Sequence, residues 1–344
     1  MRTFLKPAAG LVCAITLATA GCSSDKDDTS DAAGAGRPQS GASPSESASG
    51  TTSGTAYAPY VSATTASGND SAGSPSTYNL AFVIADGSAC TPSWNGTTAI
   101  GDSAVKSRIS ALTESGSAVR VSFGGASGKE LASTCDSASE LAAAYGKALD
   151  AAGTTEADFD VEGTQLADSD SVALRSEAIA LLQKEREDLS VTFTLPVMPS
   201  GLDDDGVALL ESANDHGVEV STVNIMTMNY GSSYDDDMGD YAKTSARAAH
   251  GQLKTVFGLS DSGAWKGLAL TSMLGVNDVD NETFSLADAA EVRAFAEEKG
   301  VAWVSMWSTF RDQRCGDDAS ADDAATDCSG VEQEAGAFAE AFTG

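Results

Sequence analysis

The chain has 344 residues, 42% of them apolar, which is enough to bury the core of one large domain or two ordinary ones. Fifty acidic residues against twenty basic ones give a formal net charge of −30 at pH 7. A charge of this sign and size repels nucleic acids and excludes a basic binding patch, so we expect neutral or cationic partners and no nucleic acid.

The N-terminus has the pattern of an export signal. Arg2 and Lys6 precede an apolar run over residues 7–20 that is too short to cross a bilayer as a mature helix. The sequence TAGC at residues 19–22 resembles a bacterial lipobox, which would make Cys22 the lipidated first residue of the mature protein. We predict a signal peptide over residues 1–21 and a lipid-anchored protein on the outer face of the cytoplasmic membrane. Free secretion is the alternative, because the motif begins with threonine rather than an aliphatic residue.

A low-complexity segment follows at residues 22–56. It consists mainly of Ser, Gly, Thr, Ala and Asp and has almost no large apolar residue. Such a composition cannot bury enough surface to fold, so we predict a disordered tether.

The cysteines suggest disulfide bonds. Once Cys13 leaves with the signal peptide and Cys22 is assigned to lipid, an even set of four remains, and thiols in exported proteins tend to pair. We predict the bridges Cys90–Cys135 and Cys315–Cys328, with four buried thiols as the alternative. Zinc-ligand spacing is absent from the sequence, so we expect no metal and no cofactor.

Eight apolar runs after the tether read as strands. They are Tyr57–Ala63, Tyr78–Ala85, Ala118–Phe123, Ala157–Glu162, Leu189–Leu195, Val220–Met228, Gly267–Leu274 and Val301–Trp307. Segments with apolar residues at helical spacing lie between them; Asp102 and Ser285 stand where helices should begin, and Gly153, Gly217 and Gly300 where helices should end. Alternating strands and helices predict an α/β domain over residues 57–344, a (β/α)8 TIM barrel. An open, doubly wound sheet is the alternative.

One of the eight units departs from this pattern. The segment from Thr64 to Thr77 is polar, rich in Gly and Ser, and contains Pro75. We therefore predict a loop in place of the first barrel helix.

The fourth predicted strand carries a row of acids. In EADFDVEG, residues 156–163, the side chains of Asp158, Asp160 and Glu162 share one face of the strand, and Phe159 and Val161 share the other. Acids spaced by about 7 Å inside a barrel cannot all be ionised, so they should share a proton and suit acid catalysis. The alternative is a solvated acidic edge strand.

Four short motifs together resemble glycoside hydrolase family 18, which contains chitinases and endo-β-N-acetylglucosaminidases. They are SFGG at 122–125, TEADFDVE at 155–162, MTMNY at 226–230 and the tryptophan that ends the eighth strand, Trp307. They occur in the family's order, and the resemblance covers about Tyr57 to Cys315. Thr155 departs from the family's first aspartate, and Asn229 stands where many relatives have aspartate.

The resemblance implies a role for each matched residue. Glu162 would act as general acid and later activate water, while Asp160 would hold the substrate's 2-acetamido group, which attacks the anomeric carbon. Asp158 would hold a proton beneath them, Tyr230 would bind the acetamido carbonyl, and Trp307 would form the floor of the pocket. The other implied substrate-binding residues are Ser122, Gly124, Gly125, Met226 and Asn229.

The predicted function is hydrolysis of β-1,4 linkages next to N-acetylglucosamine in chitin or chitooligosaccharides, by a retaining, substrate-assisted monomeric enzyme. Two alternatives remain: an endo-β-N-acetylglucosaminidase acting on N-glycans, and a non-catalytic glycan-binding lipoprotein. The segment from Asn277 to Ser285 has no room for the extra domain of large chitinases, so we expect a shallow, open cleft.

Overall fold

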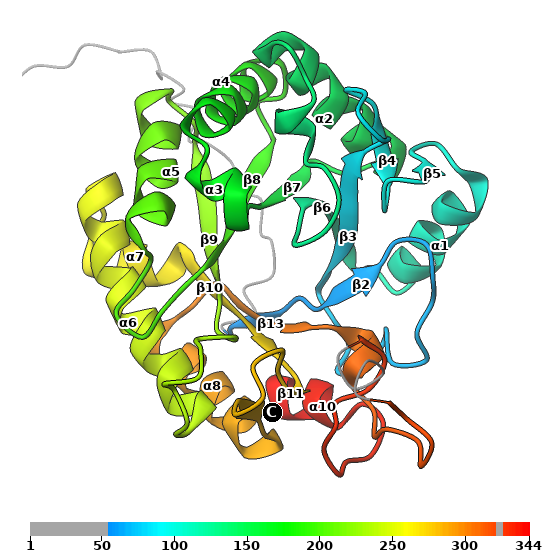
Figure 1. Cartoon of the computed structure of the whole chain (residues 1–344), viewed down its shortest axis with the longest axis vertical. Helices are drawn as coiled ribbons and strands as arrows, with labels where there is room; N and C mark the ends of the chain where they lie inside the picture. Colours follow the sequence, from blue (N-terminus) through cyan, green and yellow to red (C-terminus); the bar gives the residue numbers. More distant parts are fainter. Residues whose placement is uncertain (1–53, 321–325) are drawn as a thin grey trace, which may run out of the picture. The chain divides into compact units, whose positions relative to one another are not determined.

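The computed structural model describes residues 54–320 and 326–344, shown in colour in Figure 1. The described residues all belong to one compact unit. The predicted signal peptide, most of the tether and the lipidation site Cys22 lie outside the described residues and stay predictions.

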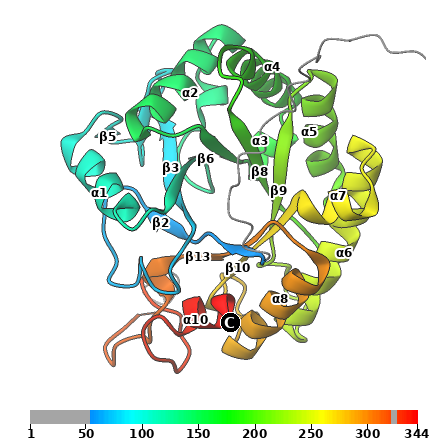
Figure 2. The same ribbon diagram turned by 180° about the vertical axis from the view of Figure 1, so that it is seen from behind.

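Parallel strands close into a barrel, with the helices around the outside (Figures 1 and 2). The order is β13, β10, β9, β8, β7, β6 and β3, each paired in parallel with the next. Their bounds are β3 (Thr77–Ala85), β6 (Ala118–Gly124), β7 (Glu156–Asp160), β8 (Ser190–Pro196), β9 (Val220–Met226), β10 (Leu268–Met273) and β13 (Trp303–Trp307).

An interrupted first strand closes the ring. Its first part, β1 (Ala56–Tyr57), pairs with β13, and its second part, β2 (Tyr60–Ser62), pairs with β3, both in parallel. Between them, the amide of Ala58 donates to Val304 and the amide of Asn79 donates to Pro59, each at 3.0 Å. Because the sheet closes on itself, the (β/α)8 prediction is confirmed and the open doubly wound sheet is wrong. Shorter strands extend the sheet outside the barrel: β4 (Pro92–Trp94) and β5 (Thr98–Ala99).

The helices begin and end where the sequence predicts. Asp102 caps α1 by accepting hydrogen bonds from two backbone amides, and Ser285 forms a capping box with Asp288 at α8. Gly153 and Gly300 end α2 and α8 in the left-handed region. The helices are α1 (Ser103–Thr113), α2 (Ala138–Ala152), α3 (Gly163–Ala167), α4 (Ser169–Glu185), α5 (Asp204–Asp215), α6 (Met238–Phe257), α7 (Asp261–Lys266), α8 (Leu286–Lys299) and α10 (Ala337–Thr343), with 3-10 turns η1 (Leu131–Ser133) and η2 (Thr309–Arg311). Within the described residues, none of the helices combines the length and apolarity that a membrane span requires.

The predicted loop in place of the first barrel helix is confirmed, since no helix lies between β2 and β3. Asp70 organises this loop: its carboxylate accepts from the Ser67 amide at 2.8 Å and from Thr309 at 2.6 Å, and it pairs with Arg108 at 3.0 Å. The C-terminal helix α10 packs nearby, where its Phe342 stacks on Tyr57. The loop is therefore held by polar contacts and covered by a helix from the other end of the domain.

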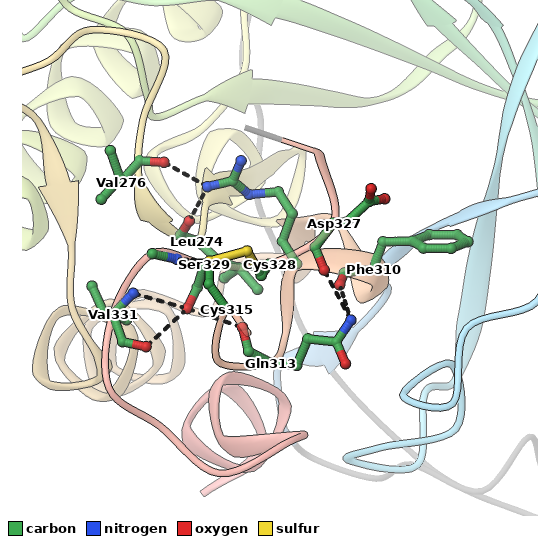
Figure 3. The surroundings of a disulfide bond; sticks show 11 residues. Leu274, Val276, Phe310, Gln313, Cys315, Asp327, Cys328, Ser329 and Val331 are labelled. Atoms are coloured by element: carbon green, nitrogen blue, oxygen red, sulfur yellow. Dashed lines mark hydrogen bonds between the residues drawn. A yellow bond between two sulfur atoms is a disulfide. The ribbon is translucent and has the colours of Figure 1, made fainter. Parts of the chain in front are cut away.

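Both predicted disulfides, Cys90–Cys135 and Cys315–Cys328, are confirmed. Figure 3 shows the second one, in the segment that follows η2. Beside it the fully buried Arg311 donates to the carbonyl of Leu274 at 2.6 Å, and the carbonyl of Ser329 accepts from Val276 at 2.7 Å. These bonds attach the segment to the small hairpin of β11 (Gly275–Val276) and β12 (Thr283–Phe284).

Candidate active site

A cavity of about 560 Å³ opens at the carboxyl ends of the barrel strands. The last residues of five strands line it: Asp160, Pro196, Met226, Met273 and Trp307. Loop residues complete its wall, among them Ala126, Ser127, Gly128, Met228, Asn229 and Asp278. In a barrel of this kind, the carboxyl end is where catalytic residues converge.

The acid row reaches this cavity as predicted, with one change of boundary. Strand β7 ends at Asp160, and Glu162 is the N-cap of the short helix α3 rather than the last residue of the strand. Glu162 keeps an extended backbone, with φ −133° and ψ 163°, so the alternation continues past the end of the strand. Asp160 and Glu162 therefore line the cavity, while Asp158 lies buried beneath them. The solvated edge-strand alternative is wrong.

Asp158 is the anchor of a polar network inside the barrel. Its carboxylate accepts hydrogen bonds from the hydroxyls of Tyr60 at 2.9 Å, Ser122 at 2.7 Å and Thr194 at 2.6 Å. Burial raises the pKa of Asp158, whereas these hydrogen bonds oppose the rise by favouring the charged form. Asn224 extends the network by donating to Thr194 at 3.0 Å.

The sequence reasoning missed Tyr60, Thr194 and Asn224 as site residues. Each stands at an inward position of a strand, and Tyr60 and Thr194 also line the cavity. A polar side chain at an inward barrel position was the available signal, because bulky apolar residues dominate these positions in most barrels of this kind.

The pKa values of Asp160 and Glu162 depend on one another. Burial is the largest cause that raises the pKa of Asp160 well above its usual value, followed by the charges of Glu162 and Asp158. Burial also raises the pKa of Glu162, but the interaction with Asp160 lowers it. The raised pKa values favour a proton on the pair over ionisation of both carboxyls. Asp160 Oδ1 is buried without a hydrogen-bond partner among the described residues.

Aromatic rings form one wall of the cavity. Trp307 stacks on Phe82 with ring centroids 5.5 Å apart, and meets Tyr60 edge-on at 5.8 Å. All three rings line the cavity, and Trp307 is partly exposed. Flat apolar rings of this kind suit the apolar face of a sugar.

The structure does not bring Tyr230 to the cavity. Its side chain is buried outside the cavity, packed against Tyr234 and Tyr241, and its hydroxyl accepts a hydrogen bond from Ser245 at 3.4 Å. Strand β9 ends at Met226, and Asn229 has a positive φ of 54°, so the strand alternation does not extend to Tyr230. Met228 lines the cavity instead, together with the expected Met226 and Asn229.

The cavity lining does not include Ser122, Gly124 and Gly125, and their predicted substrate contacts stay predictions. Ser122 lies one layer deeper and binds Asp158. The two glycines have positive φ values of 92° and 88° and lie against the protein itself: a Cβ on Gly124 would clash with the carbonyl of Asp160, and one on Gly125 would lie 2.9 Å from the Phe82 ring. The absence of a side chain at these two glycines therefore lets the end of strand β6 pack closely against Asp160 and Phe82.

Asn229 is paired with Asp278 from the segment between β11 and β12. Its amide nitrogen donates to the Asp278 carboxylate at 2.9 Å, and its amide oxygen accepts from the Asp278 backbone at 3.0 Å. The charge of Asp278 contributes to the raised pKa of Glu162. Because Asn229 is uncharged where an aspartate was expected, the acid Asp278 can lie beside it without charge repulsion.

Burial of Asp160 should cost stability at neutral pH. Because its pKa is raised in the folded protein, the cost is absent below the ordinary carboxyl pKa of about 4 and grows as the pH rises through and above it. We expect Asp160→Asn to raise the Tm at pH 7 by about 3 °C or more, and to leave it unchanged near pH 3. Melting curves of both proteins from pH 3 to pH 8 measure this.

The exposed Asp240 provides the control, because Lys243 lowers its pKa rather than raising it. Asp240→Asn should produce no such gain at pH 7. A gain for Asp160→Asn that persists at pH 3 would show that the charge of Asp160 is not the cause.

The fold and the site define a (β/α)8 barrel with two neighbouring carboxyls at the carboxyl ends of its strands. No family model matches the sequence. The chain is 34% identical over 275 residues to a probable bifunctional chitinase/lysozyme of Escherichia coli, and 34% identical over 276 residues to endochitinase 11 of Metarhizium anisopliae. Each match covers 74% of this chain but only 31% and 52% of those proteins, so the chain spans about half or less of the length of these curated relatives.

A solved structure covers the barrel more fully. Active domain 2 of a thermostable chitinase from Pyrococcus furiosus, determined as mutants complexed with chito-oligosaccharides, superposes with a TM-score of 0.73 at 28% identity. The match covers 83% of this chain and 92% of that one. Over the barrel, the chain is therefore similar in sequence and in fold to chitinase domains.

Proposed function

We propose that this protein hydrolyses β-1,4 linkages next to N-acetylglucosamine in chitin or chitooligosaccharides. The observation that carries the proposal is the position of Asp160 and Glu162, two carboxyls with raised pKa values, in a cavity lined on one side by aromatic rings. The names of the similar proteins, chitinases from a bacterium, a fungus and Pyrococcus furiosus, support the same substrate class.

The two carboxyls differ in exposure, and this difference assigns their roles. Glu162 is partly exposed and can reach a glycosidic oxygen, whereas Asp160 is only 5% exposed and sits too deep to attack an anomeric carbon. The nucleophile must then come from the substrate, and the 2-acetamido carbonyl of N-acetylglucosamine lies at the right place on the sugar.

The reaction follows from these positions. The acetamido N–H donates to the unpartnered Oδ1 of Asp160, which favours ionised Asp160 and moves the shared proton to Glu162. Glu162 passes this proton to the leaving oxygen while the acetamido oxygen attacks the anomeric carbon and forms a cyclic oxazolinium ion. Ionised Asp160 stabilises the positive charge. Glu162 then removes a proton from a water molecule. The water oxygen attacks the anomeric carbon from the face that the leaving group occupied, which opens the oxazolinium ring and retains the configuration.

Incubation of the purified protein with chitohexaose tests the proposal. We expect cleavage to shorter oligosaccharides, with the β-anomer as the first product in the NMR spectrum. A high-mannose glycopeptide is the parallel substrate: cleavage of the glycopeptide alone would indicate an endo-β-N-acetylglucosaminidase. Cleavage of neither would contradict both enzymatic functions and favour a glycan-binding protein.

A further inference from the structure

A buried ion pair lies behind the cavity wall. Arg175 of α4 and Glu130, which follows β6, form two parallel hydrogen bonds, Nε to Oε1 at 2.7 Å and Nη2 to Oε2 at 2.6 Å. The exposed fractions of the two side chains are 1% and 6%. A buried ion pair adds little net stability, because the loss of hydration offsets the attraction. Its place in the fold therefore matters more than its strength.

Glu130 ends the loop that forms one wall of the cavity. The loop residues Ala126, Ser127 and Gly128 line the cavity, and the carbonyl of Lys129 accepts from the amide of Ala85 at 2.9 Å. Glu130 also lies next to the end of β7: a Cβ on Gly124 would contact both the Glu130 side chain, at 3.8 Å, and the carbonyl of Asp160. Fixing the Glu130 carboxylate therefore fixes the loop beside Asp160.

The same guanidinium reaches the segment that carries Glu162. Arg175 Nη2 also donates to Ser171 Oγ at 3.3 Å, and Ser171 Oγ donates to Gln165 Oε1 at 3.2 Å. The backbone amide of Gln165 donates to the carbonyl of Glu162 at 3.2 Å. One buried side chain is thus connected by hydrogen bonds to both segments that flank the acid pair.

We propose that Arg175 is a positioning residue that holds the loop of residues 125–130 and the segment of residues 162–171 in register, so that Glu162 and the cavity wall face the same sugar. The proposal rests on the proposed function. It assigns Arg175 a role in turnover although it touches neither the cavity nor the acids. The planar fork of the guanidinium is required, because a lysine ammonium cannot make the two parallel bonds to Glu130.

Three variants separate positioning from stability. Arg175→Met removes the two parallel hydrogen bonds and leaves Glu130 unpaired. Arg175→Lys keeps the positive charge but not the two parallel bonds. Glu130→Leu combined with Arg175→Met replaces the pair with apolar side chains and restores stability. Arg186→Met is the control, because Arg186 caps the far end of the same helix and pairs with Asp150 at 2.8 Å, outside the cavity.

Kinetics on chitohexaose are measured well below the Tm of every variant. We expect kcat to fall by about 10²-fold in Arg175→Met, Arg175→Lys and the double variant, with KM changed by less than about 3-fold, and no change in Arg186→Met. A double variant that melts like the wild type and keeps its kcat would overturn the proposal, because the pair would then act on stability alone.

Hydrogen exchange gives a readout that does not depend on activity. Backbone amides of residues 125–133 and 162–171 should exchange about tenfold faster in the double variant than in the wild type, and at the wild-type rate in Arg186→Met. Unchanged exchange in the double variant would overturn the positioning role. If the wild type cleaves no substrate but the exchange difference appears, the proposed function fails while the positioning role stands.

Discussion

Replacing Glu162 with glutamine should lower kcat on a chromogenic chitobioside by about 10³-fold, within the range of about 10² to 10⁴ that a general acid contributes. The amide cannot give a proton to the leaving oxygen, nor can it take one from water. Its size and its contact with Asp160 are kept, so the Tm and the affinity for chitooligosaccharides should change little. Release of the chromophore, followed at saturating substrate, measures kcat directly.

A control for this substitution lies on the strand that leads to Glu162. Glu156 begins β7 and pairs with Arg120 at 2.8 Å, outside the cavity. Glu156→Gln makes the same chemical change at the other end of this strand without touching the acid pair, and should leave kcat within about twofold of the wild type. If Glu162→Gln behaves like Glu156→Gln, then Glu162 is not the general acid.

The second large effect is expected for Asp160→Asn, which should lower kcat by about 10² to 10³-fold and weaken binding only slightly. The amide oxygen can still accept the acetamido N–H, but without a negative charge it cannot stabilise the oxazolinium ion. The same substitution removes the stability cost that follows from the raised pKa of Asp160, and is expected to raise the Tm at pH 7. Stability and turnover should therefore change in opposite directions, which loss of folding cannot produce.

Tyr230→Phe is the informative comparison for Asp160→Asn. The Tyr230 hydroxyl contacts Ser245 outside the cavity, so its removal should leave kcat on the chitobioside near that of the wild type. A loss of tenfold or more would mean that Tyr230 reaches the substrate during turnover and that the cavity described here is incomplete. Wild-type turnover of Asp160→Asn would refute substrate assistance by this carboxylate.

The strand and helix pattern could be predicted because it depends on neighbours in the chain. Apolar runs of strand length separated by helical periodicity imply parallel strands, and residues such as Asp102 and Gly153 fix helix ends through their own side chain or backbone. The alternation of side chains along β7 likewise places Asp158, Asp160 and Glu162 on one face without any knowledge of other strands. The missing first helix follows from Gly, Ser and Pro75 in the same way.

The site beyond β7 was predicted only in part. The alternation of side chains between the two faces predicts their direction only within a strand, not in the loop that follows it. Trp307 and Met226 are the last residues of their strands, and their predicted positions agree with the cavity. Tyr230 lies four residues past the end of β9, after the backbone turn at Asn229, and its side chain does not line the cavity. A change of a single backbone dihedral redirects every later side chain, and the sequence carries little information on it.

What the sequence alone determined is therefore the local order: the barrel strands, the helix ends, the loop after the first strand and the row of three acids. Tertiary structure decided which groups surround those acids. Tyr60, Ser122 and Thr194 meet at Asp158, and Arg175 reaches Glu130, although these residues lie far apart in the chain. Such contacts depend on barrel closure and on the register between strands, and both are set by packing across the whole domain rather than by any single segment.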